Sequence, residues 1–217
     1  MTRTASILVI PLGPGDPDLL TLKAADSLRD GRGSLILRTG KHPLASWLEG
    51  QGIIFETLDS FYDRFDNFDK MHAAMAGELW ERAKQDSVRF AVMDPETDGA
   101  VRELKIHCPT GAKLQILPGV SPREALLASL PAEKEGGDSL QYCSATSFLS
   151  LSWNPEVPLL ITELDSSLLA GDVKLKLSDT YPEEAEVCFF PPSTVFPRPV
   201  KTIPLYRLDS QKTYDHT

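Results

Sequence analysis

The stretch "SILVIPLGPGDPDLLTLKAADSLRD", residues 6–30, joins a short apolar run to an amphipathic segment through a turn with two glycines. The apolar run at 6–10 predicts a buried strand, and the leucines and alanines of 19–28 recur near helical spacing. Gly13 and Gly15 follow the strand, at the carboxyl end where open α/β sheets bind ligands. The stretch therefore predicts an α/β fold with a ligand at this turn.

The first half of the chain continues the same alternation. Further strands are expected at residues 34–38, 52–58, 87–93 and 113–119, with helical segments between them. Strands that alternate with helices predict a mostly parallel, open sheet with helices on both faces. We assign this N-terminal α/β domain to residues 1–118.

The second half predicts a smaller mixed-sheet α/β domain at residues 119–217. It begins with a helix at 121–130 and a polar loop at 131–139. The remaining expected elements are strands at 140–143, 158–164, 186–190 and 201–208 and a helix at 166–180. The proline-rich stretch "FFPPSTVFPRP", residues 189–199, predicts a hairpin or turn between the last two strands.

Charge and composition exclude several classes of function. Thirty-one acidic against 22 basic residues give a net charge of −9, which disfavours nucleic acid and anionic membrane surfaces as partners. The same charge tolerates a cationic or zwitterionic small ligand, or it serves only to keep the protein in solution. No secretory leader or apolar run of about 20 residues is present, so we expect a cytoplasmic protein. Neither the three cysteines nor the histidines have metal-ligand spacing, so no metal site is expected.

The glycine turn does not match a phosphate-binding loop. Gly13 and Gly15 begin a Gly-x-Gly-x-x-Gly pattern, but Asp18 stands where the third glycine belongs. Asp16 would also place a negative charge beside a phosphate. A purely structural reading has Asp16 cap a helix with Pro17 at its first position, but it leaves both glycines unexplained. S-adenosylmethionine, a nucleoside with a sulfonium cation, fits a close main-chain approach without phosphate recognition.

Two motifs resemble those of the tetrapyrrole (corrin and porphyrin) methylases. Residues 11–21 are similar to the family's opening Gly-x-Gly-Pro-Gly-Asp-Pro-x-Leu-Leu-Thr, with Pro11 in place of the first glycine, and "LPGVSP", residues 117–122, is similar to the segment that leads into its second domain. Residues 38–63, 158–190 and 203–217 resemble one branch, the methylase-like domain that precedes a MazG-type nucleotide pyrophosphohydrolase in bacterial fusion proteins. In those fusions a stretch like "YDHT" leads into the hydrolase, so covalent fusion to a MazG-type domain is a further expectation.

The resemblance implies a two-domain tetrapyrrole methylase-like fold, S-adenosylmethionine as methyl donor and a homodimer. It also implies a set of cofactor-binding residues: Gly13, Pro14, Gly15, Met93, Asp94, Ser121, Ser144 and Thr162. The segment "MDPETDG", residues 93–99, departs from the family's Gly-Asp-Pro-x-x-Tyr-Gly, since Met93 replaces the glycine and Asp98 the tyrosine. Met93 puts a side chain where the family keeps the main chain open to its ligand, so either the cofactor sits differently, or Met93 turns aside, or the site has lost its methyl donor. A purely structural interpretation of the segment is an ordinary turn between a strand and a helix.

Two functions follow as hypotheses. The first is an S-adenosylmethionine-dependent methyltransferase that acts on a small-molecule acceptor, with a tetrapyrrole as the family default and Asp16 and Asp94 as the carboxylates placed to take a proton. The second is a ligand-binding or regulatory domain that has lost the transfer chemistry and is attached to, or partners, a MazG-type pyrophosphohydrolase. Met93 is the feature that favours the second.

Overall fold

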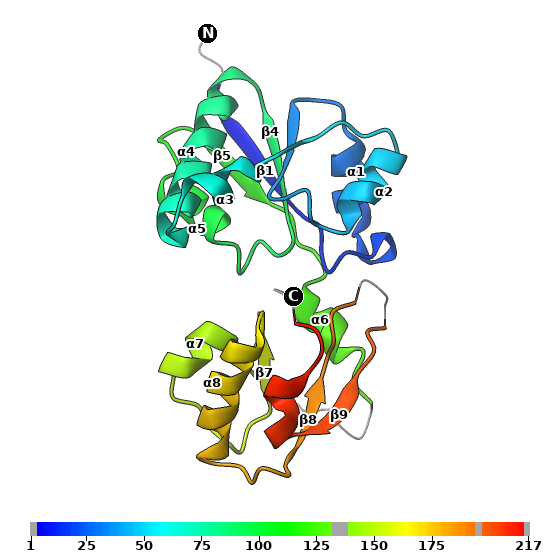
Figure 1. Cartoon of the computed structure of the whole chain (residues 1–217). Coiled ribbons are helices and arrows are strands. Elements are labelled where there is room, and N and C mark those ends of the chain that lie inside the picture. Colours follow the sequence, from blue (N-terminus) through cyan, green and yellow to red (C-terminus); the bar gives the residue numbers. More distant parts are fainter. Residues whose placement is uncertain (1–3, 132–138, 194–196, 215–217) are drawn as a thin grey trace. The chain divides into compact units, whose positions relative to one another are not determined.

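The computed structural model describes residues 4–131, 139–193 and 197–214. The chain forms two compact units, residues 1–122 and 123–217 (Figure 1). Each unit has its own apolar core, as expected for parts that bury their side chains separately.

The first unit is built on a five-stranded sheet, and all of its ladders are parallel. The strand order is β3-β2-β4-β1-β5, so β4 is central, β2 and β1 flank it, and β3 and β5 lie at the edges. The strands are β1 (Ser6–Pro11), β2 (Ser34–Leu37), β3 (Glu56–Thr57), β4 (Val88–Val92) and β5 (Lys113–Ile116). The predicted open parallel sheet is confirmed.

Helices cover both faces of this sheet, as predicted (Figure 1). The helices of the unit are η1 (Pro17–Leu19, 3-10), α1 (Leu22–Arg29), α2 (Leu44–Gly50), α3 (Ser60–Arg64), α4 (Phe68–Gln85) and α5 (Gly99–Ile106). Alternate side chains of a strand point to opposite faces. Ile7 and Val9 accordingly pack with α3, α4 and α5, whereas Ile10 packs with α1 and α2.

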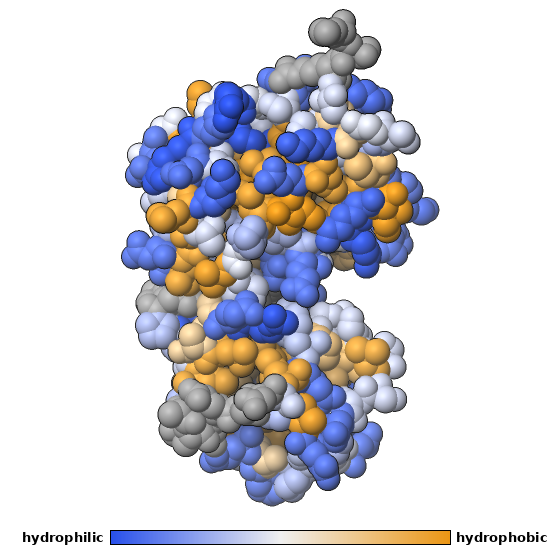
Figure 2. Space-filling view, turned by 180° about the vertical axis from the view of Figure 1, so that it is seen from behind, coloured by the Kyte–Doolittle hydropathy of each residue, from blue (hydrophilic) through white to orange (hydrophobic). Residues whose placement is uncertain are grey.

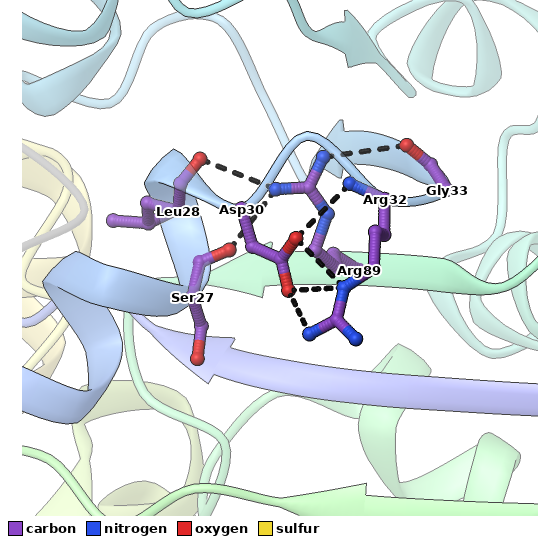
Figure 3. Close-up of polar contacts among 6 residues, drawn as sticks. All are labelled: Ser27, Leu28, Asp30, Arg32, Gly33 and Arg89. Carbon is purple, nitrogen blue, oxygen red and sulfur yellow. Dashed lines mark hydrogen bonds and ion pairs between the residues drawn. The ribbon is translucent and has the colours of Figure 1, made fainter.

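A buried arginine of β4 forms hydrogen bonds to the C-terminal end of α1 and to the residue before β2, at the amino end of the sheet (Figure 3). Arg89 of β4 donates from Nη1 to the carbonyl oxygens of Ser27 (3.0 Å) and Leu28 (3.2 Å), and from Nη2 to that of Gly33 (3.3 Å). The carbonyls at a helix C-terminus have no partner within the helix, so a cation that binds them stabilises that end. Burial lowers the pKa of Arg89.

The second unit contains two separate two-stranded ladders rather than one continuous sheet among the described residues. The strands β6 and β7 pair in parallel, and β8 and β9 pair antiparallel, which confirms the expected mixture. The elements are α6 (Pro122–Leu127), β6 (Gln141–Ser144), α7 (Ala145–Ser150), β7 (Leu159–Thr162), α8 (Ser167–Ser178), β8 (Glu186–Phe189), β9 (Lys201–Pro204) and η3 (Leu205–Ser210, 3-10). A cluster around Phe148 and Val173 forms the core.

Several elements differ in extent from the sequence-based expectation. The strand expected at 52–58 is reduced to the two residues of β3, because only Glu56 and Thr57 pair with β2. Neither α3 nor α7 was expected, and the end of the strand predicted at 201–208 is the 3-10 helix η3. The tip of the proline-rich turn, most of the polar loop at 131–139 and "DHT" at the end of "YDHT" lie outside the described residues. None of the helices in the described ranges is long and apolar enough to cross a bilayer.

Candidate functional site

The glycine turn continues the central ladder of the first unit beyond the strands. Leu12 N donates to Val92 O (2.7 Å) and Gly13 N donates to Met93 O (2.9 Å). These bonds hold Gly13 beside Met93 at the carboxyl edge of β1 and β4. Two segments that the sequence analysis assigned to cofactor binding are therefore in direct contact.

Both glycines of the turn adopt left-handed backbone conformations, with φ of 67° at Gly13 and 111° at Gly15. A Cβ on Gly13 would lie 3.0 Å from the carbonyl oxygen of Val120, and a Cβ on Gly15 would lie 2.8 Å from Cγ of Pro43. The chain's own packing thus requires glycine at both positions. The sequence suggests a ligand as the reason for a close approach here, but the atoms that approach the glycines are those of Val120 and Pro43.

Pro11, which departs from the family motif, is matched by a glycine on the neighbouring segment. A Cβ on Gly119 would overlap the ring of Pro11. The proline at the start of the turn and the glycine of "LPGVSP" are therefore complementary in shape. This contact brings the third predicted segment, which includes Ser121, to the same edge of the sheet.

His42, in the loop after β2, forms a hydrogen bond to the glycine turn. Its side chain is 6% exposed, Nε2 lies 3.0 Å from the carbonyl oxygen of Gly13, and Nδ1 accepts from Leu44 N at 3.2 Å. Because Nδ1 accepts, the proton of the neutral ring is on Nε2, which donates to Gly13. Burial lowers the pKa of His42. The sequence offers no signal for this burial, since the spacing of the histidines excludes only a metal site.

The two candidate catalytic carboxylates each accept a main-chain amide. Asp16 caps η1 by accepting from Asp18 N (2.9 Å), and Asp94 accepts from Glu96 N (2.9 Å). Pro17 is the first residue of η1, as the capping interpretation predicted. Asp94 directly follows Met93, so it lies at the same strand end as the glycine turn.

Asp98, which stands where the family has tyrosine, has a structural role in this chain. It caps α5 by accepting from Val101 N (3.0 Å), and it pairs with Arg38 Nε at 3.2 Å. Arg38 in turn donates to the hydroxyl of Tyr62 (2.8 Å). Burial raises the pKa of Tyr62.

His72 of α4 lies against the start of α5, beside this ion pair. A Cβ on Gly99 would overlap its imidazole. His72 Nδ1 is buried without a hydrogen-bond partner, and burial, with Arg38 as a smaller contribution, lowers its pKa. The glycine that closes "MDPETDG" is therefore required by packing against His72.

The last two predicted cofactor residues belong to the second unit. Ser144 ends β6 and Thr162 ends β7, and the two are directly paired in the parallel ladder. Ser144 caps α7 by accepting from Ser147 N at 3.3 Å, while Thr162 is 9% exposed. Glu163, the next residue, has φ of 59°, so the chain turns sharply where β7 ends.

The structure therefore forms two groups from the predicted residues. One group, at the carboxyl edge of the first sheet, contains Gly13, Pro14, Gly15, Met93, Asp94 and Ser121, and the other contains Ser144 and Thr162. Sequence reasoning missed Arg38, His42, Tyr62 and His72. For Arg38 and His42 the available signal was "RTGKHP", residues 38–43, which covers the end of an expected strand and the loop after it, where open α/β sheets bind ligands. The described residues contain no cluster of three or more side chains suited to a metal ion.

Comparison with known proteins gave one relative in sequence and many in structure. No family model matches the sequence. The uncharacterized protein YabN of Bacillus subtilis (strain 168) is 26% identical over 209 residues, which are 94% of this chain and 42% of YabN. The chain thus spans less than half the length of that relative.

Two solved structures have the same architecture over nearly the whole chain. Uroporphyrin-III-C-methyltransferase from Thermus thermophilus superposes with a TM-score of 0.69 at 18% identity, covering 98% of this chain and 91% of that one. The chain has the tetrapyrrole methylase fold. A putative cobalamin synthesis related protein (CobF) from Corynebacterium diphtheriae has a TM-score of 0.65 at 16% identity, covering 97% of this chain and 90% of that one. At 18% and 16% sequence identity, these two comparisons show a shared fold alone.

Proposed function

We propose that this protein is an S-adenosylmethionine-dependent methyltransferase of the tetrapyrrole methylase family. The observation that carries the proposal is the contact between Gly13 and Met93, which joins the family-like turn to the "MDPETDG" segment at the carboxyl end of β1 and β4. Ligands of open α/β sheets bind at such strand ends. The likeness in fold to a protein named as a methyltransferase supports the same proposal.

The negative charge of the residues at this edge suits the positive charge of the methyl donor. The donor carries a sulfonium cation and supplies an already activated methyl group, and Asp16 and Asp94 place two carboxylates on the segments around Gly13. Each carboxylate accepts one main-chain amide, which orients it. We assign donor binding to Gly13, Pro14, Gly15, Met93, Asp94 and Ser121 of the first unit, and Ser144 and Thr162 stay predictions from the sequence resemblance.

In the reaction, the sulfur–methyl bond breaks as a bond to an acceptor carbon or nitrogen forms. Alignment of the two reactants is the main task of the protein, because the donor needs no further activation. Asp94 or Asp16 takes the proton that the acceptor loses. The acceptor is a small molecule, with a tetrapyrrole as the first candidate, and the active form is a homodimer.

One observation favours a second candidate function, a domain that binds a ligand without transferring a group. The side chain of Met93 stands where the family has glycine, and its carbonyl oxygen already accepts from Gly13. Such a domain would serve a MazG-type pyrophosphohydrolase to which it is fused or bound. The greater length of YabN leaves room for a further domain.

Calorimetry with S-adenosylmethionine tests the proposal. The methyltransferase is expected to bind the donor with a Kd on the order of 1–100 μM. Asp94→Asn and Asp16→Asn keep the oxygen that accepts the main-chain amide but remove the charge, so they should weaken binding without loss of stability. Wild-type protein that shows no binding, together with a Met93→Gly variant that gains it, would replace the first candidate by the second.

A further inference from the structure

Arg38 lies one residue beyond β2, on the side of β4 opposite the glycine turn. Arg38 N donates to Ala91 O (2.8 Å), and Gly13 N donates to Met93 O on the other side of β4. Neighbouring strands are about 4.8 Å apart, so the main chains of Arg38 and Gly13, two strands apart, are separated by about 10 Å. Arg38 therefore belongs to the same carboxyl edge as the glycine turn, within the length of a small ligand.

The guanidinium of Arg38 is held in one orientation by Asp98 and Tyr62. Arg38 Nε pairs with Asp98 Oδ2 at 3.2 Å, and Nη1 donates to the Tyr62 hydroxyl at 2.8 Å. The guanidinium carbon lies 5.0 Å from the centre of the Tyr62 ring, and the side chain of Arg38 is 12% exposed. A planar guanidinium that is fixed by its neighbours binds a ligand with little loss of conformational freedom.

Both Arg38 and Tyr62 keep donors that the protein does not use. Arg38 Nη2 has no hydrogen-bond partner among the residues that the structure describes, and it is not one of their fully buried unpartnered atoms, so it reaches solvent. The hydroxyl of Tyr62 accepts from Arg38, while its own proton has no acceptor within the described ranges. Burial raises the pKa of Tyr62, so the hydroxyl retains that proton at neutral pH. The site therefore offers a cationic group and a neighbouring hydroxyl that can both donate.

Carboxylate and phosphate groups match these donors in shape and charge. A guanidinium binds either group through paired N–H···O bonds in one plane. Asp98 does not compete for the remaining donors, because its carboxylate already accepts from Val101 N and from Arg38. The net charge of the chain is −9, and hydrophilic residues cover much of the face in Figure 2, so the protein as a whole does not attract anions. An anion at this edge is held by the local hydrogen bonds.

We propose that Arg38 and Tyr62 bind a carboxylate or phosphate group of a small-molecule ligand at the carboxyl end of β2. Neither residue belongs to the set assigned to the methyl donor, so we assign the group to a second ligand. That this ligand is the methyl acceptor rests on the proposed function. The acceptor is then an anionic molecule that extends over about 10 Å, from the glycine turn to Arg38.

Titration of the nitrogen-15-labelled whole chain with sodium phosphate, and separately with sodium acetate, tests the site without the methyl donor. The NMR signal of the Arg38 Nε–H should shift and saturate with a Kd on the order of 1–20 mM, since a free ion makes only part of a ligand's contacts. Sodium chloride at the same ionic strength should leave the signal unchanged. Arg32 is the internal control, because its pair with Asp30 is 87% exposed. The anion that binds more tightly identifies the group as phosphate or carboxylate.

The ring of His72 gives an independent measurement. Burial and, to a smaller extent, the charge of Arg38 lower the pKa of His72. A bound anion offsets the charge of Arg38, so the pKa of His72 should be higher at saturating anion. His42 is bonded to Gly13 rather than to Arg38, and its pKa should not change.

Three variants separate the hydrogen bonds from the charge. Arg38→Lys keeps the charge but loses the planar group, so anion binding measured at His72 should weaken about tenfold. Tyr62→Phe keeps the ring and removes the hydroxyl, which should weaken binding about threefold. Tyr206→Phe removes an exposed hydroxyl beside another arginine, in the second unit, and should bind as wild type. If Arg38→Lys does not fold by circular dichroism, Tyr62→Phe carries the test.

Three results would overturn the proposal. The first is an Arg38 signal that neither anion shifts. The second is an equal shift with chloride, or an equal shift of the Arg32 signal, which would make the effect one of ionic strength. The third is calorimetry in which Arg38→Lys and Tyr62→Phe weaken binding of S-adenosylmethionine as much as binding of the anion, which would assign the group to the donor's own carboxylate. Anion binding at Arg38 in a protein that does not bind S-adenosylmethionine would reject the proposed function and leave the anion site in place.

Discussion

The imidazole of His42 donates from Nε2 to the carbonyl oxygen of Gly13 at 3.0 Å, so the loop after β2 holds the turn after β1 in place. The bond from Leu44 N to Nδ1 requires a neutral ring. Protonation of Nδ1 would remove that acceptor and place a charge in a buried position. The geometry of the glycine turn is therefore linked to the protonation of one side chain.

We expect the free energy of unfolding to fall as the pH is lowered from 7.5 to 5.5. Burial lowers the pKa of His42 below the unfolded value of about 6.5, so the unfolded chain binds more protons between the two pKa values. The contribution of neutral His42 is complete above about 6.5 and is lost as the pH falls toward the pKa of the folded protein.

Urea unfolding at several pH values measures this dependence. His72, whose pKa is lowered in the same direction, adds to it, so His42→Gln and His72→Gln are compared. His42→Gln should reduce the slope. The link to the glycine turn is rejected if only His72→Gln does so. The lowered pKa values of Asp30, Asp59 and Asp209 act below about 4, outside this range.

Alanine at the two glycines of the turn should destabilise the first unit. Gly13→Ala and Gly15→Ala each combine a left-handed conformation with a close contact, which together cost about 1–3 kcal/mol. Gly31 and Gly77 have no atom within 4 Å of an added Cβ and have no positive φ. Gly31→Ala should be nearly neutral, and Gly77→Ala, within α4, should stabilise by about 0.5–1 kcal/mol. Equal losses at all four positions in thermal unfolding would argue against the packing explanation.

The contact between Pro11 and Gly119 predicts a coupled pair. Gly119→Ala should cost about 1–3 kcal/mol because its Cβ overlaps the proline ring. Pro11→Gly removes the ring and restores the residue of the family motif, so the double variant should recover most of that loss. A double-mutant cycle from urea unfolding measures the coupling. Additive effects would mean that the two residues do not share the space.

Removal of the buried guanidinium should destabilise α1 and the start of β2. Arg89→Met keeps an unbranched chain but leaves the carbonyls of Ser27, Leu28 and Gly33 without their donor, a loss of about 2–4 kcal/mol. The control is Arg32→Ala, because this neighbouring side chain is 87% exposed in its pair with Asp30 and should contribute little to stability. Chemical denaturation compares the two variants, and similar small losses would contradict the role assigned to Arg89.

The fold was largely predictable because its signals are local. A short apolar run that is followed by a helical period predicts one strand and one helix, and repetition of that pair predicts the parallel sheet. Expectations failed where the signal was weak. The five-residue helix α3 and the 3-10 helix η3 are short, and β3 is an edge strand with only two paired residues.

The sequence by itself determined the α/β class, the place of the glycine turn and the segments expected around it. Only the tertiary structure decided what those glycines contact, since Pro43 and Val120 are remote from them along the chain. The same holds for the pairing of Arg38 with Asp98 and for the burial of His42. Hydrophobic periodicity depends only on residues that are close in sequence, so it indicates which face of a helix or strand is apolar. Contacts between loops depend on how the strands are ordered in the sheet, and no local spacing records that order.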